Sequence, residues 1–371
     1  MTNSIWQRGP VDVVREADAV VVGGGIAGVA AALYLRERGQ RVILLEARTL
    51  AAGASGRNAG FLLTGTAEHY AAAVERYGRE GARLAWSASV ANRARLLAAA
   101  DGLGVPLERC GSVLACVDEA EAAAALASAR LLAEDGFEGR FEASDPLRRG
   151  FVGALVKPGD AALDPVGLVQ ALAVASGAAI LEHCPVYRVG QGAVHSAVGE
   201  VRAPTAIIAA GPHTPHLLPP LGGAIAPVRA QMLATGPGPR VLDTLVYANH
   251  GYDYVRQLPD GRLLAGGSRD HAAAEEVGFE DRVTATVQDA IAAFVRRHFP
   301  DVAAPVAGRW SGVMEFTADL LPLVGAVPGM PGVYVCAGFS GHGLAFALEA
   351  AARVVACALD GASPGILGVS R

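Results

Sequence analysis

The sequence predicts a protein of the mixed α/β (α+β) class, and three observations support this. The apolar run 19–22, a glycine turn, a helix and the apolar run 42–46 form one strand–turn–helix–strand unit. Two strand-like runs joined by the turn 259–261, YDYVRQL and RLLAGGS, indicate an antiparallel sheet within 227–270. With 371 residues, 52% of them hydrophobic and 18% charged, the chain is long enough for two domains and a large core.

The first unit carries a dinucleotide-binding pattern. Gly23, Gly25 and Gly28 follow the strand in G-x-G-x-x-G register, which permits a tight turn, close approach of phosphates and packing of the helix on the sheet. The N-terminus of the helix offers free N–H groups to a pyrophosphate. Glu46 ends the second strand, where a carboxylate accepts hydrogen bonds from ribose hydroxyls and repels the extra phosphate of an NADP-type ligand. The unit predicts a dinucleotide site without identifying the dinucleotide.

Composition and charge argue against several other classes of function. The net charge is −5 and no basic face accumulates, so we expect no nucleic-acid partner. No segment has the pattern of a signal peptide or a membrane span, which predicts a cytoplasmic protein with no membrane partner. His213 and His216 have no acidic or cysteine neighbour and the cysteines lack C-x-x-C spacing, so we expect neither a metal site nor disulfides. The cysteines are Cys110, Cys116, Cys184, Cys336 and Cys357.

The other elements follow in order along the chain. Residues 1–17 are expected to form a short extension that packs on the surface, and the glycine-rich loop 51–65 follows directly on the dinucleotide unit, which marks it as functional. Further helices are predicted over 67–100, 118–134, 163–176 and 283–298, and further strands over 179–189 and 201–211. The last strand, 332–336, leads through the glycine-rich segment 338–343 into a helix over 343–358.

Four segments resemble the D-amino-acid oxidase family of FAD-dependent oxidoreductases, which includes sarcosine and glycine oxidases and the γ-glutamylputrescine oxidase branch. They are GGGIAG with Glu46, SGRNAG at 55–60, WSGVMEFTADLLPLVG at 310–325, and GFSGHG at 338–343. The SGRN form of the loop is most similar to the γ-glutamylputrescine oxidase branch. The resemblance spans nearly the whole chain.

The resemblance implies a Rossmann-like FAD-binding domain built from 1–66, 150–219 and 305–371. An antiparallel-sheet substrate domain, 67–149 and 220–304, is inserted between these segments, with the isoalloxazine ring at the junction. The last helix would direct its positive end at the N1 and C2 carbonyl side of the flavin; the alternative is that its glycines only make a turn before a core helix. The residues expected to bind FAD, non-covalently, are Gly23, Gly25, Ile26, Ala27, Gly28, Glu46, Ala47, Arg48, Ser55, Gly56, Arg57, Asn58, Ala59, Gly60, Val186, Ala210, Gly211, Gly338, Ser340, Gly341, His342, Gly343 and Leu344.

We predict an enzyme that oxidises the C–N bond of a small-molecule amine or amino acid to an imine by hydride transfer to flavin N5, with O2 as the acceptor. A dehydrogenase using another electron acceptor, a non-catalytic flavin-binding subunit of a larger complex and an NAD-linked reductase are the alternatives. This chemistry requires no dedicated general base. The candidate substrate-cavity residues are His342, Tyr252, Tyr254, Glu315 and Met314, each of which has a structural role as the alternative.

Two departures from the family pattern concern the flavin. In the sarcosine oxidase branch a cysteine binds the isoalloxazine covalently, and the matching position here is about Gly312, so we expect non-covalent FAD. Relatives of that type also place a lysine over the flavin to assist oxygen reduction, but the strand 262–268 contains none, and Lys157 is distant in sequence. We therefore expect slow oxygen use, or activation by Arg57, His342 or a substrate ammonium.

A third departure concerns the substrate. Family members that act on α-amino acids carry an arginine that binds the α-carboxylate, and the corresponding position here is Met314, followed by Glu315. This predicts a cavity for an amine without an adjacent carboxylate, with Glu315 favouring a cationic substrate. The alternative is that another arginine, for instance Arg256 or Arg229, holds a carboxylate from a different strand.

Overall fold

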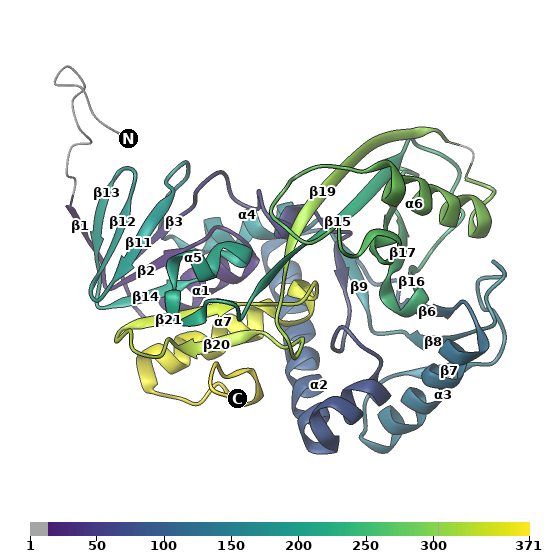
Figure 1. Ribbon diagram of the computed structural model, residues 1–371, viewed down its shortest axis with the longest axis horizontal. Helices are drawn as coiled ribbons and strands as arrows, with labels where there is room; N and C mark the ends of the chain where they lie inside the picture. The colour runs from purple at the N-terminus through teal and green to yellow at the C-terminus, as the bar shows by residue number, and fades with distance from the viewer. Residues whose placement is uncertain (1–13, 303) are drawn as a thin grey trace.

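The computed structural model describes residues 14–302 and 304–371, in which two large β-sheets are joined by helices (Figure 1). The first sheet has the strand order β10, β3, β2, β14, β21, β20, and its neighbours are parallel except for the edge pair β20 and β21. These strands are β2 (Ala19–Val22), β3 (Val42–Leu45), β10 (Ala179–Leu181), β14 (Thr205–Ile208), β20 (Leu323–Ala326) and β21 (Val333–Ala337). This arrangement confirms the predicted Rossmann-like domain.

Both faces of this sheet are covered. One face packs against the helices α1 (Ile26–Glu37), α4 (Pro165–Ser176) and α7 (Gly343–Asp360), and their apolar side chains form the largest buried cluster. The other face shares a second cluster with a small sheet of order β1, β13, β12, β11. Its strands are β1 (Val14–Glu16), β11 (Val186–Gly190), β12 (Ala193–Ser196) and β13 (Gly199–Arg202). Burial on both sides explains the uninterrupted apolar runs of β2 and β3.

The second large sheet has eight strands, in the order β19, β15, β18, β17, β16, β6, β8, β7, and only the pair β16 and β6 is parallel. The predicted antiparallel sheet within 227–270 is therefore confirmed as its centre. The strands are β6 (Ser112–Cys116), β7 (Arg140–Glu142), β8 (Gly153–Lys157), β15 (Ala226–Thr235), β16 (Leu245–Ala248), β17 (Asp253–Gln257), β18 (Leu263–Gly267) and β19 (Val306–Phe316).

Helices cover both faces of the second sheet. Val113 and Ala115 of β6 join the cluster of α6 (Ala285–His298), whereas Cys116 joins that of α3 (Glu119–Glu134), because successive side chains of a strand point to opposite faces. The long helix α2 (Tyr70–Leu103), kinked at Gly78, contacts both α3 and α7 and so connects the two sheets. The remaining short elements are β4 (Phe61–Leu62), β5 (Leu107–Glu108), β9 (Ala161–Leu163) and α5 (Thr214–Leu217).

Several predicted boundaries are wrong. The run 179–189 forms two strands, β10 and β11, and 201–211 spans the end of β13 and all of β14, because turns interrupt each apolar run. The helix predicted over 163–176 begins at Pro165, since Asp164 caps it by accepting a hydrogen bond from the N–H of Val166. Helix α2 starts at Tyr70 and continues to Leu103, and α6 starts at Ala285.

The division into domains remains a proposal. Strands β8 and β19 pair within the eight-stranded sheet, although the expected boundaries at 150 and 305 assign both to the cofactor domain. We propose the same discontinuous division, with these two strands moved to the substrate domain. The extension expected over 1–17 lies mostly outside the described residues, and its described part, β1, pairs in parallel with β13. Within the described residues, no helix combines the length and the apolar character needed to cross a membrane.

Candidate active site

A cavity of about 740 Å³ lies between the two large sheets. It is lined by the carboxyl ends of β2 and β14, by the first residues of α1 and α7, and by β17, β18 and β19 of the eight-stranded sheet. Ligands of open α/β sheets bind at the carboxyl ends of the strands, so this is the expected place for a dinucleotide. A cavity is therefore present at the junction between the two sheets, where the resemblance places the isoalloxazine ring.

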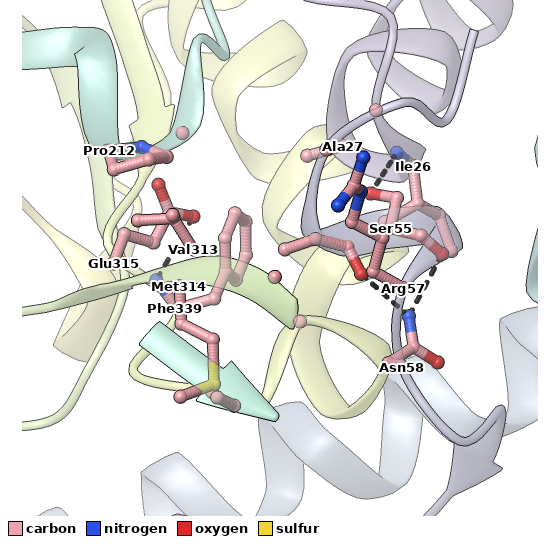
Figure 2. Close-up of a pocket in the computed structure, with 18 of the residues that line it drawn as sticks. Ile26, Ala27, Ser55, Arg57, Asn58, Pro212, Val313, Met314, Glu315 and Phe339 are labelled. Atoms are coloured by element: carbon pink, nitrogen blue, oxygen red, sulfur yellow. Dashed lines mark hydrogen bonds between the residues drawn. The ribbon is translucent and has the colours of Figure 1, made fainter. Parts of the chain in front are cut away.

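The glycine turn leaves one end of this cavity open to phosphate groups. Gly25 caps α1 without a side-chain hydrogen bond, and the N–H of Ile26 donates to Ser55 Oγ at 3.0 Å (Figure 2). A Cβ atom on Gly25 would lie 2.9 Å from Ser55 Oγ, so a larger residue would fill the space next to the helix N-terminus. A Cβ on Gly28 would lie 1.9 Å from the carbonyl oxygen of Gly23, which explains the close packing of helix on turn.

Glu46 lies beside this turn as predicted. Its Oε2 accepts a hydrogen bond from the N–H of Gly24 at 2.6 Å, and its Oε1 accepts one from the N–H of Arg48 at 2.7 Å. Each carboxylate oxygen can accept a second hydrogen bond. The carboxylate is therefore held in one orientation by the backbone and retains acceptor sites for ribose hydroxyls.

The loop after β3 crosses from one sheet to the other. Arg57 donates to Asp281 Oδ2 at 2.6 Å and to the carbonyl oxygen of Ser311 at 2.8 Å, while Trp310 Nε1 donates to the carbonyl of Arg57 at 3.0 Å. Asn58 is used within the loop, because its amide donates to the carbonyls of Ala54 and Ser55 (Figure 2). Both Arg57 and Asn58 line the cavity, and both hold the loop; Asp281 neutralises the Arg57 charge.

Strand β19 presents two neighbouring residues on opposite sides. Met314 Sδ lies 3.3 Å from the position of a Cβ on Gly341, whereas Glu315 extends toward Gly211 and Pro212 (Figure 2). Glu315 is buried: its Oε1 accepts a hydrogen bond from the N–H of Phe339 at 3.4 Å, and its Oε2 has no partner among the residues that the structure describes. Burial raises the pKa of the Glu315 carboxyl to about 7.

His342 occupies the position just before α7. Its Nδ1 is 3.3 Å from the carbonyl oxygen of Ser340, so we assign the ring proton to Nδ1 and a free lone pair to Nε2. Burial is the main cause that lowers the pKa of His342 to about 4. The positive charges of Lys157 and Arg269 contribute to this lowering, whereas the hydrogen bond to Ser340 acts in the opposite direction. A neutral imidazole at neutral pH argues against His342 as an oxygen-activating cation, and its role stays a prediction.

The sequence did not predict Arg269, which lines the cavity one residue beyond the lysine-free strand 262–268. Its guanidinium carbon lies 4.4 Å from the ring centre of Tyr252 and 5.3 Å from that of Phe316. Among residues 14–302 and 304–371 it forms no ion pair. Its place directly after a predicted strand was a signal that could have found it, because functional residues often follow strand ends.

The two arginines that the sequence suggested as ligands of a substrate carboxylate already form ion pairs with glutamates of the protein. Arg256 donates to Glu108 Oε1 at 2.5 Å and to two backbone carbonyls, and Arg229 forms a fully buried pair with Glu276 at 2.7 Å. The alternative that Arg256 or Arg229 binds the substrate carboxylate is therefore wrong.

Tyr252 and Tyr254 line the cavity as expected, and Tyr254 stacks on Tyr247 at 5.6 Å between ring centres.

Most of the residues expected to bind FAD line the cavity, and four glycines do not. Their role is packing, because a Cβ on any of them would lie 1.9–2.6 Å from a neighbouring atom. These four are Gly28, Gly56, Gly60 and Gly338. Two cysteines that the sequence did not place at the cofactor site, Cys184 and Cys336, also line the cavity, and burial raises the pKa of the Cys336 thiol far above its ordinary value.

The described residues fit an FAD molecule. One end of the cavity offers the α1 N-terminus and the Glu46 carboxylate for pyrophosphate and ribose, and the other offers the N-terminus of α7, again without a side-chain cap. The volume lies within the range of small-molecule and cofactor sites.

Comparisons with known proteins agree with this geometry. A family model described as FAD dependent oxidoreductase (DAO) matches residues 18–357. Glycine oxidase of Pseudomonas putida is 27% identical over 93% of this chain and 95% of its own length. Gamma-glutamylputrescine oxidoreductase of Escherichia coli is 25% identical over 95% of this chain and 86% of its own. The crystal structure of glycine oxidase from Geobacillus kaustophilus superposes with a TM-score of 0.80 at 22% identity, covering 96% of this chain and 99% of that one.

Proposed function

Because the chain belongs to the DAO family of FAD-dependent oxidoreductases, we propose that it oxidises the CH–NH group of an amino acid whose carboxylate is held by Arg269. When bound, FAD supplies the hydride acceptor for this chemistry. The printed names of the relatives support a donor of this type, since glycine oxidase and gamma-glutamylputrescine oxidoreductase are named for amino-group substrates. O2 as the electron acceptor belongs to the same proposal, with a dehydrogenase as its alternative.

The guanidinium of Arg269, which forms no ion pair in the described part of the chain, is the observation that carries this proposal. It lies between the rings of Tyr252 and Phe316, whose faces attract the cation and restrict its orientation. A planar guanidinium in a fixed orientation can bind a carboxylate through two parallel hydrogen bonds. Since Arg269 has no carboxylate partner within the described residues, a substrate carboxylate would complete this site.

The amino group of the substrate needs a neutral hydrogen-bond acceptor beside it rather than a charged side chain. Neutral His342 has its Nε2 lone pair available, and it can accept a hydrogen bond from the substrate nitrogen. Met314 and Phe316 give the wall beside it apolar surface, which excludes water from the reacting carbon. Glu315 is not assigned to the substrate amine, because it lies on the other face of β19 from Met314.

An amine without an adjacent carboxylate is the second candidate, and Met314 is the observation that favours it. Methionine replaces the arginine that carboxylate-binding family members place at this position, as the sequence resemblance implies. In this case Arg269 would contribute only to the cavity wall. Substrates with and without a carboxylate adjacent to the oxidised amine therefore separate the two candidates.

The experiment is anaerobic mixing of the FAD-loaded protein with glycine, sarcosine, D-alanine, putrescine and γ-glutamylputrescine, followed by the loss of the flavin absorbance. We expect reduction by one or more of the α-amino acids glycine, sarcosine and D-alanine. Arg269→Gln should lower kcat/KM for them by roughly 10–150-fold, since a hydrogen bond to a charged group contributes about 1.5–3 kcal/mol.

Arg262→Gln is the matched control, because Arg262 is exposed on the same strand hairpin and, within the described residues, its side chain pairs only with Asp260. It should leave kcat/KM unchanged. Reduction by putrescine or γ-glutamylputrescine with none by glycine, sarcosine or D-alanine, and no effect of Arg269→Gln, would refute the proposal in favour of the amine candidate.

A further inference from the structure

Three metal-ligating side chains from distant parts of the sequence converge at the rim of the cavity. They are His69, directly before α2; Glu121, in the first turn of α3; and His250, in the short helical turn Asn249–Gly251 between β16 and β17. One ligand atom from each lies within 4.8 Å of the others, and His69 Nε2 is 4.0 Å from Glu121 Oε1. The two imidazole rings meet edge to face at 5.7 Å between centres.

Both ring nitrogens of His69 are buried without a hydrogen-bond partner in the described structure. The His69 side chain is only 8% exposed. A buried polar group without a partner costs about 1–3 kcal/mol, which is why such groups are rare in native proteins. A species that accepts the lone pair of an imidazole nitrogen would remove this cost.

Glu121 supplies the negative charge. Its side chain is fully buried, with Oε1 accepting a hydrogen bond from the N–H of His250 at 2.6 Å and Oε2 accepting one from the N–H of Val117 at 2.8 Å. No lysine or arginine among the described residues pairs with it. The ammonium of Lys157 is nearby, but it donates to the carbonyl of Thr64 at 2.7 Å. The carboxylate is therefore oriented by backbone and available to a cation.

We propose that His69, Glu121 and His250 bind a divalent transition-metal ion, for which Zn²⁺ is the probe. Two imidazoles and one carboxylate are a ligand set that zinc and similar ions use, with a water completing the coordination, whereas Mg²⁺ and Ca²⁺ prefer oxygen ligands. Bonds of about 2.0–2.2 Å in a tetrahedron place the ligand atoms about 3.3–3.6 Å apart. The ligand atoms of His69 and Glu121, 4.0 Å apart, would have to approach by about 0.4–0.7 Å. His250 is exposed, so its side chain can move the larger distance of about 1.2–1.5 Å that remains.

The proposed ion would tie the cavity wall to two helices. His250, Gly251 and Tyr252 line the cavity, and the ion would hold this turn against the start of α2 and the first turn of α3. The site is independent of the proposed function, because none of its three ligands is assigned a role in substrate oxidation. The sequence predicts no metal site because these ligands are far apart along the chain and have no recognisable spacing.

The test is calorimetric titration of the FAD-loaded, chelator-treated protein with Zn²⁺, and separately with Mg²⁺. We expect one Zn²⁺ per chain, a higher thermal unfolding temperature with Zn²⁺ present, and no binding of Mg²⁺. His250→Asn is the most informative variant: it removes a ligand, and asparagine tolerates the positive φ of 53° at this position. It should weaken Zn²⁺ binding by more than the roughly 10–100-fold that loss of a ligand's hydrogen-bond partner costs.

Glu121→Gln provides a second variant, because glutamine keeps an acceptor for one backbone N–H and loses the charge. His195→Gln is the control: His195 lies on β12 in the small sheet and should leave the isotherm unchanged. Unchanged flavin content in each variant confirms that it is folded. No binding of Zn²⁺ by the wild type, or binding that persists in both His250→Asn and Glu121→Gln, would overturn the proposal.

Discussion

Replacing Glu315 by glutamine should stabilise the protein at high pH and have a much smaller effect at low pH. The carboxyl is buried, one of its oxygens has no hydrogen-bond partner in the described structure, and burial raises its pKa from 4.5 to about 7. A carboxyl whose pKa is raised in the folded state binds a proton more tightly there than in the unfolded state. Its contribution to stability is therefore fully present below pH 4.5 and is lost as the pH rises through 7.

The magnitude follows from the size of this shift. A difference of 7 − 4.5 = 2.5 pKa units corresponds to about 3 kcal/mol at about 1.36 kcal/mol per unit. Between pH 5 and pH 8 the linkage relation gives about 2.5 kcal/mol of this loss. Glutamine has the same shape and no titration, so it removes the loss while keeping an acceptor for the N–H of Phe339.

The assay is urea unfolding of wild type and Glu315→Gln at pH 5 and pH 8. FAD-free protein should be used, so that cofactor binding does not add to the apparent stability. The stability difference between the two proteins should change by about 2.5 kcal/mol in favour of Glu315→Gln as the pH rises. A difference that stays constant between pH 5 and pH 8 would show that the Glu315 carboxyl is not perturbed by burial.

The remaining predictions concern the flavin. Acid precipitation should release FAD into the supernatant, because Gly312 matches the position of the cysteine that anchors flavin covalently in relatives; a yellow pellet would contradict this. Gly25→Val should nearly abolish FAD occupancy, measured by absorbance, since its side chain fills the phosphate space. Full FAD occupancy in Gly25→Val would show that this turn does not bind the phosphates. Glu46→Ala should only weaken FAD binding, roughly 10–150-fold, because one lost hydrogen bond to a charged group costs about 1.5–3 kcal/mol. In stopped-flow reoxidation by O2, Arg269→Gln should slow the reaction and His342→Gln should not, because only Arg269 is charged at neutral pH; equal rates in wild type and Arg269→Gln would remove Arg269 as the activating cation.

The sequence alone determined the dinucleotide unit, because its signals are local. The glycine spacing, the apolar strands and Glu46 lie within 19–46, and the structure places them as the spacing requires. The same is true of the helix over 118–134, whose start is set by Asp118 accepting a hydrogen bond from the N–H of Glu121. Strands joined by a short turn, such as β17 and β18, were also predictable, since a hairpin fixes its own partner.

Only the tertiary structure decided which of these residues meet. Arg256 and Arg229 are held by carboxylates 148 and 47 residues away, whereas Arg269 has no ion-pair partner among residues 14–302 and 304–371. No local pattern distinguishes these three arginines. Likewise, the alternation of β19 separates Met314 from Glu315, but its pairing with β15 decides which of them faces the substrate end of the cavity. Contacts between distant segments depend on how whole sheets and helices pack, so charge pairing and side-chain convergence in the active site are properties of the fold.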